Sequence, residues 1–330
     1  MRRLFLACLS AFVCAGAAHA GTWQVQKVTA PARVMAVETA DGKVRVNAGG
    51  LWYQLVFNGD KPTLKFIDAP PKPELPPGAL PDGRIATGAH DIARAWLAQP
   101  TERYDHGILG DAIEAGSLVI EGADGKRQEI KLDDDAVFED LSPRIVDLDG
   151  NGHDAVIVVK SYLKRGSALA VIAERRGRYQ IVAETPPLGA AHRWLDPAGI
   201  ADFTGDGKLD IALVRQPHAV GALELWSWSN NALRKVAELP DTANHIAGTR
   251  AIDMSAVADF DGDGIADLAL PSLDLASLRI VSFAPHAREI TSVALPAKAA
   301  TDIGLMRKGA APVLVLGLAD GSLAVVRQSE

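Results

Sequence analysis

One nine-residue stretch of this chain, residues 259–267, is rich in aspartate and glycine. Its carboxylates occupy the first, third, fifth and ninth positions, as Asp259, Asp261, Asp263 and Asp267. Glycines at the fourth and sixth positions permit positive φ, which lets a short backbone curl around a point. Carboxylates held roughly 5 Å apart repel one another by about 3 kcal/mol per pair at an effective dielectric constant of ~20. A hard dication removes this cost, and calcium suits a flexible all-oxygen loop better than zinc or copper does.

The same pattern occurs twice more, each time followed by an apolar run. The copy that begins at residue 202 has at its odd positions Asp202, Thr204, Asp206, Lys208 and Asp210. The copy that begins at residue 147 has at its odd positions Asp147, Asp149, Asn151 and His153, with Asp154 one residue before the ninth position. The three starting residues are 55 and 57 residues apart. A loop-plus-strand unit at a nearly constant spacing indicates a repeat architecture.

Other aspartate-rich calcium loops have a different spacing. An EF-hand requires a glutamate at its twelfth position and a helix on each side. The twelfth positions here are Leu270, Leu213 and Val158, and the flanking segments are β-rich. Dockerin-type loops also require an acidic twelfth residue, and calcium-binding nonapeptide repeats recur about every nine residues. None of these three families accounts for the pattern.

Over residues 141–295 the sequence resembles the FG-GAP repeat, also called VCBS, of integrin α-subunits. Its pattern is a D-x-D/N-x-D-G-x-x-D loop followed by a strand. The resemblance implies a β-propeller with one calcium loop per blade, in which side chains at positions 1, 3, 5 and 9 and the backbone carbonyl of position 7 bind the ion. The implied ligands are Asp147, Asp149, Asn151, His153, Asp202, Thr204, Asp206, Lys208, Asp210, Asp259, Asp261, Asp263, Ile265 and Asp267. Charge tunes the affinity of such loops, so the 259 loop is expected to bind Ca²⁺ most tightly, the 202 loop next, and the 147 loop weakly or not at all.

The elements that must position these loops are predicted to be β-strands of a single domain, residues 21–330. Three blades with metal loops are expected at residues 141–190, 196–245 and 252–296. The segment 301–330 offers three strands where a blade needs four, and residues 23–28 form a spare strand. Pairing of the two would close an all-β propeller of about six blades. Seven blades remain an alternative.

The first 20 residues have the form of a secretory signal. Arg2 and Arg3 precede an apolar run, and Ala18-His19-Ala20 matches the cleavage pattern. Both cysteines, Cys8 and Cys14, lie in this segment, so we expect a mature chain without disulfides, starting after Ala20, in the periplasm or secreted. Loss of the two arginines changes the net charge from −7 to −9. That charge argues against nucleic acid as a partner, and we expect no membrane span and a monomer.

No motif of a serine hydrolase, zinc protease or phosphate-binding loop occurs in the sequence. We therefore assign no catalytic residue and no cofactor besides Ca²⁺. The favoured function is a calcium-binding propeller that acts as a scaffold or binds a protein or a glycan. The alternative is a hydrolase or lyase that uses carboxylates of the central channel. His106, Asp111 and Glu114, which are close in sequence, would be candidates for such a role.

Overall fold

The computed structural model describes residues 22–329. Antiparallel sheets arranged around a centre make up this range, with one short 3-10 helix, η1 (Gly107–Leu109), and no α-helix. No helix in the described range is long and apolar enough to cross a membrane. The predicted signal segment, with Cys8 and Cys14, lies outside the described residues.

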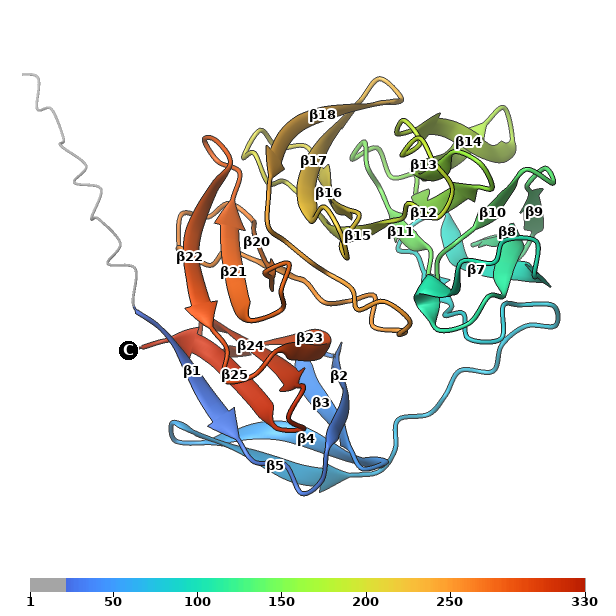
Figure 1. Cartoon of the computed structure of the whole chain (residues 1–330). Helices are drawn as coiled ribbons and strands as arrows, with labels where there is room; N and C mark the ends of the chain where they lie inside the picture. Colours follow the sequence, from blue (N-terminus) through green and yellow to red (C-terminus); the bar gives the residue numbers. More distant parts are fainter. Residues whose placement is uncertain (1–21, 330) are drawn as a thin grey trace, which may run out of the picture.

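The sheets follow one another along the chain in groups of four strands (Figure 1). The first group is β2 (Val34–Ala40), β3 (Lys43–Ala48), β4 (Leu51–Asn58) and β5 (Lys61–Ile67). The second is β6 (Ala86–Thr87), β7 (Ile92–Thr101), β8 (Glu114–Gly122) and β9 (Arg127–Lys131). The third is β11 (Arg144–Val146), β12 (Ala155–Tyr162), β13 (Gly166–Arg175) and β14 (Arg178–Glu184). A short strand, β10 (Ala136–Phe138), pairs with both β8 and β12 and joins the second and third groups into one sheet.

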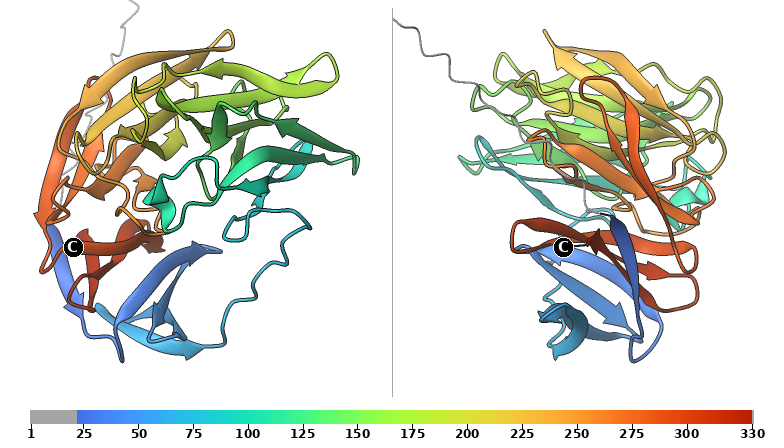
Figure 2. Two further views of the ribbon diagram at one scale, coloured as in Figure 1. Left: turned by 45° about the vertical axis from the view of Figure 1, so that its right-hand side comes forward. Right: turned by 90° about the vertical axis from the view of Figure 1, so that its left-hand side faces the viewer.

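The remaining sheets belong to the C-terminal half. The fourth is β15 (Leu195–Ala201), β16 (Asp210–Arg215), β17 (Ala222–Ser229) and β18 (Ala232–Leu239). The fifth is β19 (Ala256–Ala258), β20 (Asp267–Pro271), β21 (Ser277–Ser282) and β22 (Arg288–Ala294). The sixth combines β23 (Ala299–Lys308), β24 (Ala311–Leu318) and β25 (Leu323–Gln328) with β1 (Trp23–Val28). The views in Figure 2 show these sheets stacked side by side around the centre.

The strand after each aspartate-rich loop is apolar because its sheet packs on both faces. In β12, Val156, Ile157, Val158 and Val159 are all fully buried. A strand covered on both faces is expected to be continuously hydrophobic, whereas a strand covered on one face alternates. The outer strand of the same sheet, β14, has no fully buried residue and alternates between exposed and partly buried residues over its first four positions. The loops therefore lie at the ends of the most deeply buried strands.

The predicted pairing of the chain termini is confirmed. β1 runs antiparallel to β25 in a register from Trp23 opposite Gln328 to Val28 opposite Leu323. The ring of Trp23 also packs edge-on against Phe260 of the fifth sheet, with ring centroids 5.8 Å apart. The N-terminal strand thus completes the sixth sheet and covers an edge that would otherwise be open.

Closure of the ring is not confirmed. Within residues 22–329, four apolar clusters seal the contacts between neighbouring sheets, but none joins the β2–β5 sheet to the β6–β9 sheet. Figure 1 shows these two sheets separated, with the intervening chain running between them. β3 is accordingly buried on one face only, through Val44, Val46 and Ala48, and Met35 and Phe66 of the same sheet are exposed. The described chain forms a ring of six four-stranded groups, two of which β10 joins into one sheet, and the ring has one open side.

The centre of the ring is crossed by the loop between β18 and β19, residues 240–255. The backbone N–H of Gly248 donates to the carbonyl oxygen of Ile108 in η1, at 2.8 Å. The guanidinium of Arg250 forms ion pairs at 2.8 Å with both Asp82 and Asp111. These contacts connect the fourth and fifth sheets to the second across the centre, where several carboxylates are buried.

Candidate metal centre

Backbone N–H groups fix the shape of the 259 loop. The carboxylate of Asp259 accepts hydrogen bonds from the N–H of Gly262 at 2.6 Å and of Gly264 at 3.0 Å. Both glycines have positive φ, +83° and +87°, which is the conformation that the sequence pattern requires. The carboxylate of Asp263 accepts from the N–H of Ile265 at 2.8 Å. Aspartate side chains of the loop thus hold its own backbone in a closed shape.

Three of the four predicted carboxylates of this loop converge. One oxygen from each of Asp259, Asp261 and Asp267 lies within 4.8 Å of the others, while Asp263 is outside this triplet. Asp267 is fully buried, and its Oδ2 accepts from the N–H of Phe260 at 2.9 Å. Its Oδ1 is buried and has no hydrogen-bond partner within 3.5 Å, and the nearby Ser282 hydroxyl only partly offsets the effect of burial on the pKa of Asp267. A buried carboxylate oxygen without a donor is costly, so the residues present fit an oxygen-binding cation.

The negative charges of the 259 loop lie close enough to affect one another. Burial, together with the negative charges of Asp261 and Asp263, raises the pKa of Asp267 to about 6. The guanidinium of Arg288 lies 3.2 Å from Asp261 and offsets part of the negative charge. The remaining carboxylates still leave an excess of negative charge at the triplet.

The 202 loop has the same backbone hydrogen bonds as the 259 loop but one carboxylate fewer. Asp202 accepts from the N–H of Gly205 at 2.7 Å and of Gly207 at 2.8 Å, and Asp206 accepts from the N–H of Lys208 at 3.0 Å. The Thr204 hydroxyl, which replaces the second carboxylate, donates to Asp210 Oδ2 at 3.2 Å. Burial raises the pKa of Asp210 to about 6. This loop therefore offers fewer charged oxygens than the 259 loop.

The 147 loop keeps its shape, but its carboxylates serve other contacts. Asp147 accepts from the N–H groups of Asn151 and Gly152, at 3.1 and 2.7 Å, and Asn151 Oδ1 accepts from the N–H of His153 at 2.9 Å. The indole N–H of Trp228 donates to Asp149 at 2.8 Å. Neither Trp228 nor this contact could be recognised from the sequence, because the partners are 79 residues apart.

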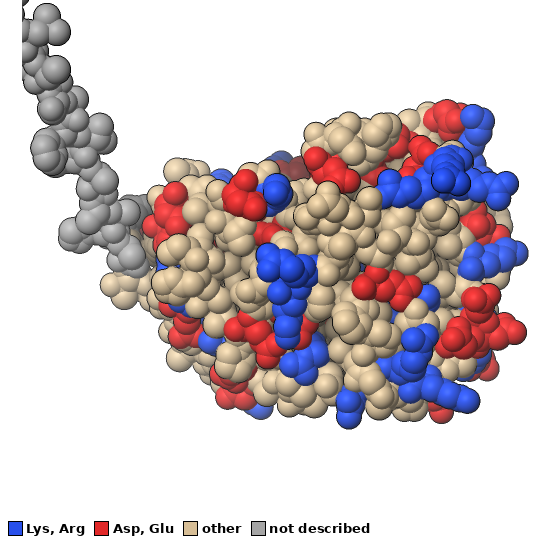
Figure 3. Space-filling view, turned by 90° about the horizontal axis from the view of Figure 1, so that it is seen from above, with Lys and Arg blue, Asp and Glu red and all other residues tan. Residues whose placement is uncertain are grey.

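Contacts between the loops place them next to one another. A Cβ atom on Gly205 would lie 2.7 Å from the side chain of Ile265, so the 202 and 259 loops touch. A cavity of about 420 Å³ lies between the 147 and 202 loops, and Asp149, Lys208 and Trp228 contribute to its walls. Figure 3 shows basic and acidic side chains interspersed on the side of the molecule that it presents, without a field of a single sign.

A second group of carboxylates, at the centre of the ring, was mostly missed by sequence reasoning. Glu139 is fully buried, and its Oε1 lies 2.6 Å from Nδ1 of His106. Glu114 is 1% exposed, and burial together with the charge of Glu139 raises its pKa well above the ordinary range. Asp111, which was considered together with His106 and Glu114, instead pairs with Arg250. No local pattern marks Glu139, because its partner is 33 residues away.

Comparisons with known proteins support the repeat. Residues 202–270 match the family model described as FG-GAP-like repeat. No curated protein matches the chain. Among solved structures, a chain in "Crystal structure of BBS1N in complex with ARL6DN, soaked with mercury" is similar at 12% sequence identity with a TM-score of 0.43, covering 87% of this chain and 75% of that one. The matched segment contains the 202 and 259 loops and the buried strand that follows each. This chain therefore carries an FG-GAP-like repeat within an all-β, propeller-like arrangement of four-stranded sheets.

Proposed function

We propose that this protein is a calcium-stabilised, propeller-like module that binds a protein or a glycan outside the cytosol. The observation that carries the calcium site is the triplet of Asp259, Asp261 and Asp267, together with the unpartnered buried oxygen of Asp267. The carbonyl of Ile265, at the seventh position, would complete the set. The expected location follows from the signal-like residues 1–20.

Calcium would offset the negative charge of the 259 loop and would link the two ends of the loop. Asp259 lies just after β19, and Asp267 is the first residue of β20. An ion held by both would fix the connection between the inner two strands of the fifth sheet. Loops of this extracellular kind bind calcium with dissociation constants of roughly 10⁻⁴ to 10⁻³ M. The ion is therefore expected to contribute to structure rather than to act as a sensor of low calcium concentrations.

A binding module is favoured over an enzyme by the burial of the central carboxylates. Glu139 is fully buried and Glu114 is 1% exposed, so a substrate could not reach either group in this arrangement. A hydrolase or lyase that uses channel carboxylates remains the alternative. It would require the 240–255 loop to move away from η1.

Thermal unfolding with calcium and with a chelator tests the proposal. Calcium at about ten times its dissociation constant stabilises the fold by ~1.4 kcal/mol per site, so the melting temperature of the wild type should rise with calcium and fall with EGTA. The double variant Asp259→Asn/Asp261→Asn should lose most of this response. Asp41→Asn is a matched control, because the Asp41 side chain is 89% exposed in a hairpin turn and its variant should respond as the wild type does. An equal calcium response in the wild type and the double variant would rule out the 259 site.

Location and ligand require separate measurements. N-terminal sequencing of the protein recovered from a periplasmic fraction should give a mature chain that begins at Gly21. Glycan arrays and pull-downs from the same fraction, with calcium and with EGTA, should identify a ligand, with the 259 double variant as the matched bait. Recovery of the uncleaved chain from the cytosol alone would contradict the proposed location.

A further inference from the structure

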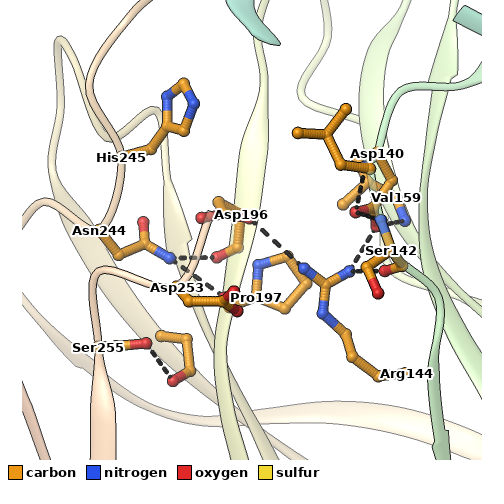
Figure 4. Close-up of polar contacts among 12 residues, drawn as sticks. Asp140, Ser142, Arg144, Val159, Asp196, Pro197, Asn244, His245, Asp253 and Ser255 are labelled. Carbon is orange, nitrogen blue, oxygen red and sulfur yellow. Dashed lines mark hydrogen bonds and ion pairs between the residues drawn. The ribbon is translucent and has the colours of Figure 1, made fainter. Parts of the chain in front are cut away.

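Asp196, near the start of β15, has a buried carboxylate that no donor satisfies. The residue is 1% exposed, and both of its carboxylate oxygens are buried without a hydrogen-bond partner. The nearest cation is Arg144, whose Nη2 lies 3.8 Å from Asp196 Oδ1, too far for a hydrogen bond. Arg144 instead donates to the carboxylate of Asp140 and to the carbonyl oxygen of Ser142, as Figure 4 shows.

Asn244, in the 240–255 loop, contacts the backbone of Asp196 and carries a third buried oxygen without a donor. The residue is fully buried, and its Nδ2 donates to the backbone carbonyl oxygens of Asp196 at 3.1 Å and Pro197 at 3.2 Å (Figure 4). These two acceptors fix the orientation of the amide, because the reversed amide would place Oδ1 against two carbonyl oxygens. Asn244 Oδ1 is buried without a donor. These two residues, in contact through the backbone of Asp196, carry three buried side-chain oxygens that have no hydrogen-bond donor in the described chain.

The neighbouring histidine cannot supply the missing donor, because both of its ring nitrogens already have partners. His245 Nε2 lies 3.0 Å from the carbonyl oxygen of Thr249, and its Nδ1 lies 2.9 Å from Nε2 of His218. The ring is therefore held by the loop itself. In Figure 4 it lies apart from the carboxylate of Asp196.

Burial raises the pKa of Asp196 well above its ordinary range, and the neighbouring charges act on it with both signs. Asp140, Asp253 and Asp302 act on Asp196 with negative charge, and Arg144 acts with positive charge. The second guanidinium nearby, Arg84, pairs with Asp253 at 2.5 Å and lies 3.9 Å from Asp302. Four carboxyl groups thus share two guanidinium groups. Buried water could satisfy acceptor oxygens, but it would not supply the positive charge that a bound cation brings to these carboxyl groups.

Two of the carboxyl groups that act on Asp196 line a cavity at the ring's open side. A cavity of about 540 Å³ lies between β2 and β23, and Arg84, Asp253 and Asp302 contribute to its walls. The Asp253 side chain is 60% exposed and also acts electrostatically on Asp196.

We propose that Asp196 and Asn244 bind a hard divalent cation, of which calcium fits best, at the centre of the ring beneath the 240–255 loop. Carboxylate and amide carbonyl oxygens are typical calcium ligands, and no sulfur or unoccupied imidazole nitrogen is part of the group. The site is separate from the three aspartate-rich loops. Because Asp196 belongs to the fourth sheet and Asn244 to the crossing loop, the ion ties that loop to the ring.

Calcium stoichiometry separates this site from the 259 loop. Equilibrium dialysis against calcium chloride is performed on the wild type, Asp196→Asn, Asp259→Asn/Asp261→Asn and a variant that combines all three changes. The Asp196→Asn variant should lose one bound calcium, the loop variant should lose a different one, and the combined variant should lose both. Asp134→Asn, whose carboxylate is fully exposed, is the matched control and should bind as the wild type does. Equal stoichiometry in Asp196→Asn and the wild type would overturn the proposal and leave Asp196 protonated or satisfied by water.

A second measurement keeps the test decisive if Asp196→Asn does not fold. Terbium is added to the wild type and to the loop variant, and its emission is excited through tryptophan, since Trp194 is only two residues from Asp196. The loop variant should retain terbium emission that calcium displaces, and Trp194→Phe in that background should reduce it. If Asp259→Asn/Asp261→Asn lost all terbium emission that calcium displaces, the central site would be overturned. The same result would verify the site in the 259 loop.

Discussion

The carboxylate of Asp154 accepts a hydrogen bond from the backbone N–H of His90, at 2.9 Å, across the contact between the second and third sheets. It also lies 3.3 Å from the N–H of Ile92 and is 3% exposed. In the 259 loop the corresponding late carboxylate, Asp267, accepts from Phe260 of its own loop. Asp154 thus joins two sheets, and the 147 loop loses a charge that an ion would need.

Calcium affinity should follow the order 259, 202, 147. Asp261→Asn removes a carboxylate of the triplet and should abolish the tightest calcium-dependent heat in titration calorimetry. Asp149→Asn should leave that heat unchanged, because Asp149 already accepts from Trp228 and its loop supplies few charges. The order would be wrong if the two substitutions removed equal calcium-dependent heat.

Loss of the Asp154 carboxylate should destabilise the fold without affecting the 259 loop. Asp154→Ala leaves the N–H groups of His90 and Ile92 buried without an acceptor, which costs roughly 1–3 kcal/mol for each unsatisfied group. Urea denaturation should show a stability lower by about 2–4 kcal/mol. Calcium calorimetry on the same variant should match the wild type. A large change in calcium binding would mean that Asp154 is itself a ligand.

Glu114 should make the protein less stable at high pH. Its pKa in the folded state is raised by burial and by neighbouring carboxylates, so the folded protein keeps this proton where the unfolded chain releases it. The contribution is fully present below the ordinary glutamate pKa of about 4.5 and is lost as pH rises toward the folded-state pKa, at no more than about 1.4 kcal/mol per pH unit.

Glu114→Gln removes that titration, so its stability between pH 5 and pH 9 should fall less steeply than that of the wild type. Urea denaturation across this range measures the difference in slope. Parallel profiles for the two proteins would show that Glu114 is ionised in the fold.

The β2–β5 sheet should open more readily than the rest of the ring, because it is packed on one face only. Hydrogen exchange measured by mass spectrometry should show weaker protection in β3 and β4 than in β12 and β13, which are buried on both faces. Equal protection in all four strands would show that something covers the open face in solution.

Gly199 should not tolerate a side chain. A Cβ atom there would lie 2.6 Å from the side chain of Val257, where the fourth and fifth sheets meet. Gly199→Ala is therefore expected to destabilise the fold by about 1–3 kcal/mol through overpacking. Gly107→Ala is the control, since a Cβ atom at that position meets nothing within 4 Å. Similar melting temperatures for the two variants would contradict this close approach.

The sequence by itself determined the repeat, the shape of the loops and the pairing of the N-terminal strand with the last sheet. Each loop is held by hydrogen bonds between residues two to five positions apart, such as Asp259 with Gly262 and Gly264. Interactions of this range are encoded in nine residues, so the pattern is sufficient to predict them. The pairing of β1 with β25 was predictable because the C-terminal segment lacked one strand and the N-terminal segment had one to spare.

The tertiary structure alone decided which polar groups meet across sheets. Asp154 turns toward His90, Trp228 binds Asp149, and Asn244 approaches Asp196 from a loop 48 residues away. The open side of the ring is decided in the same way, since it depends on how all the four-stranded groups stack. These contacts depend on the twist and spacing of the stacked sheets. Every strand contributes to that stacking, so no local stretch of sequence encodes it.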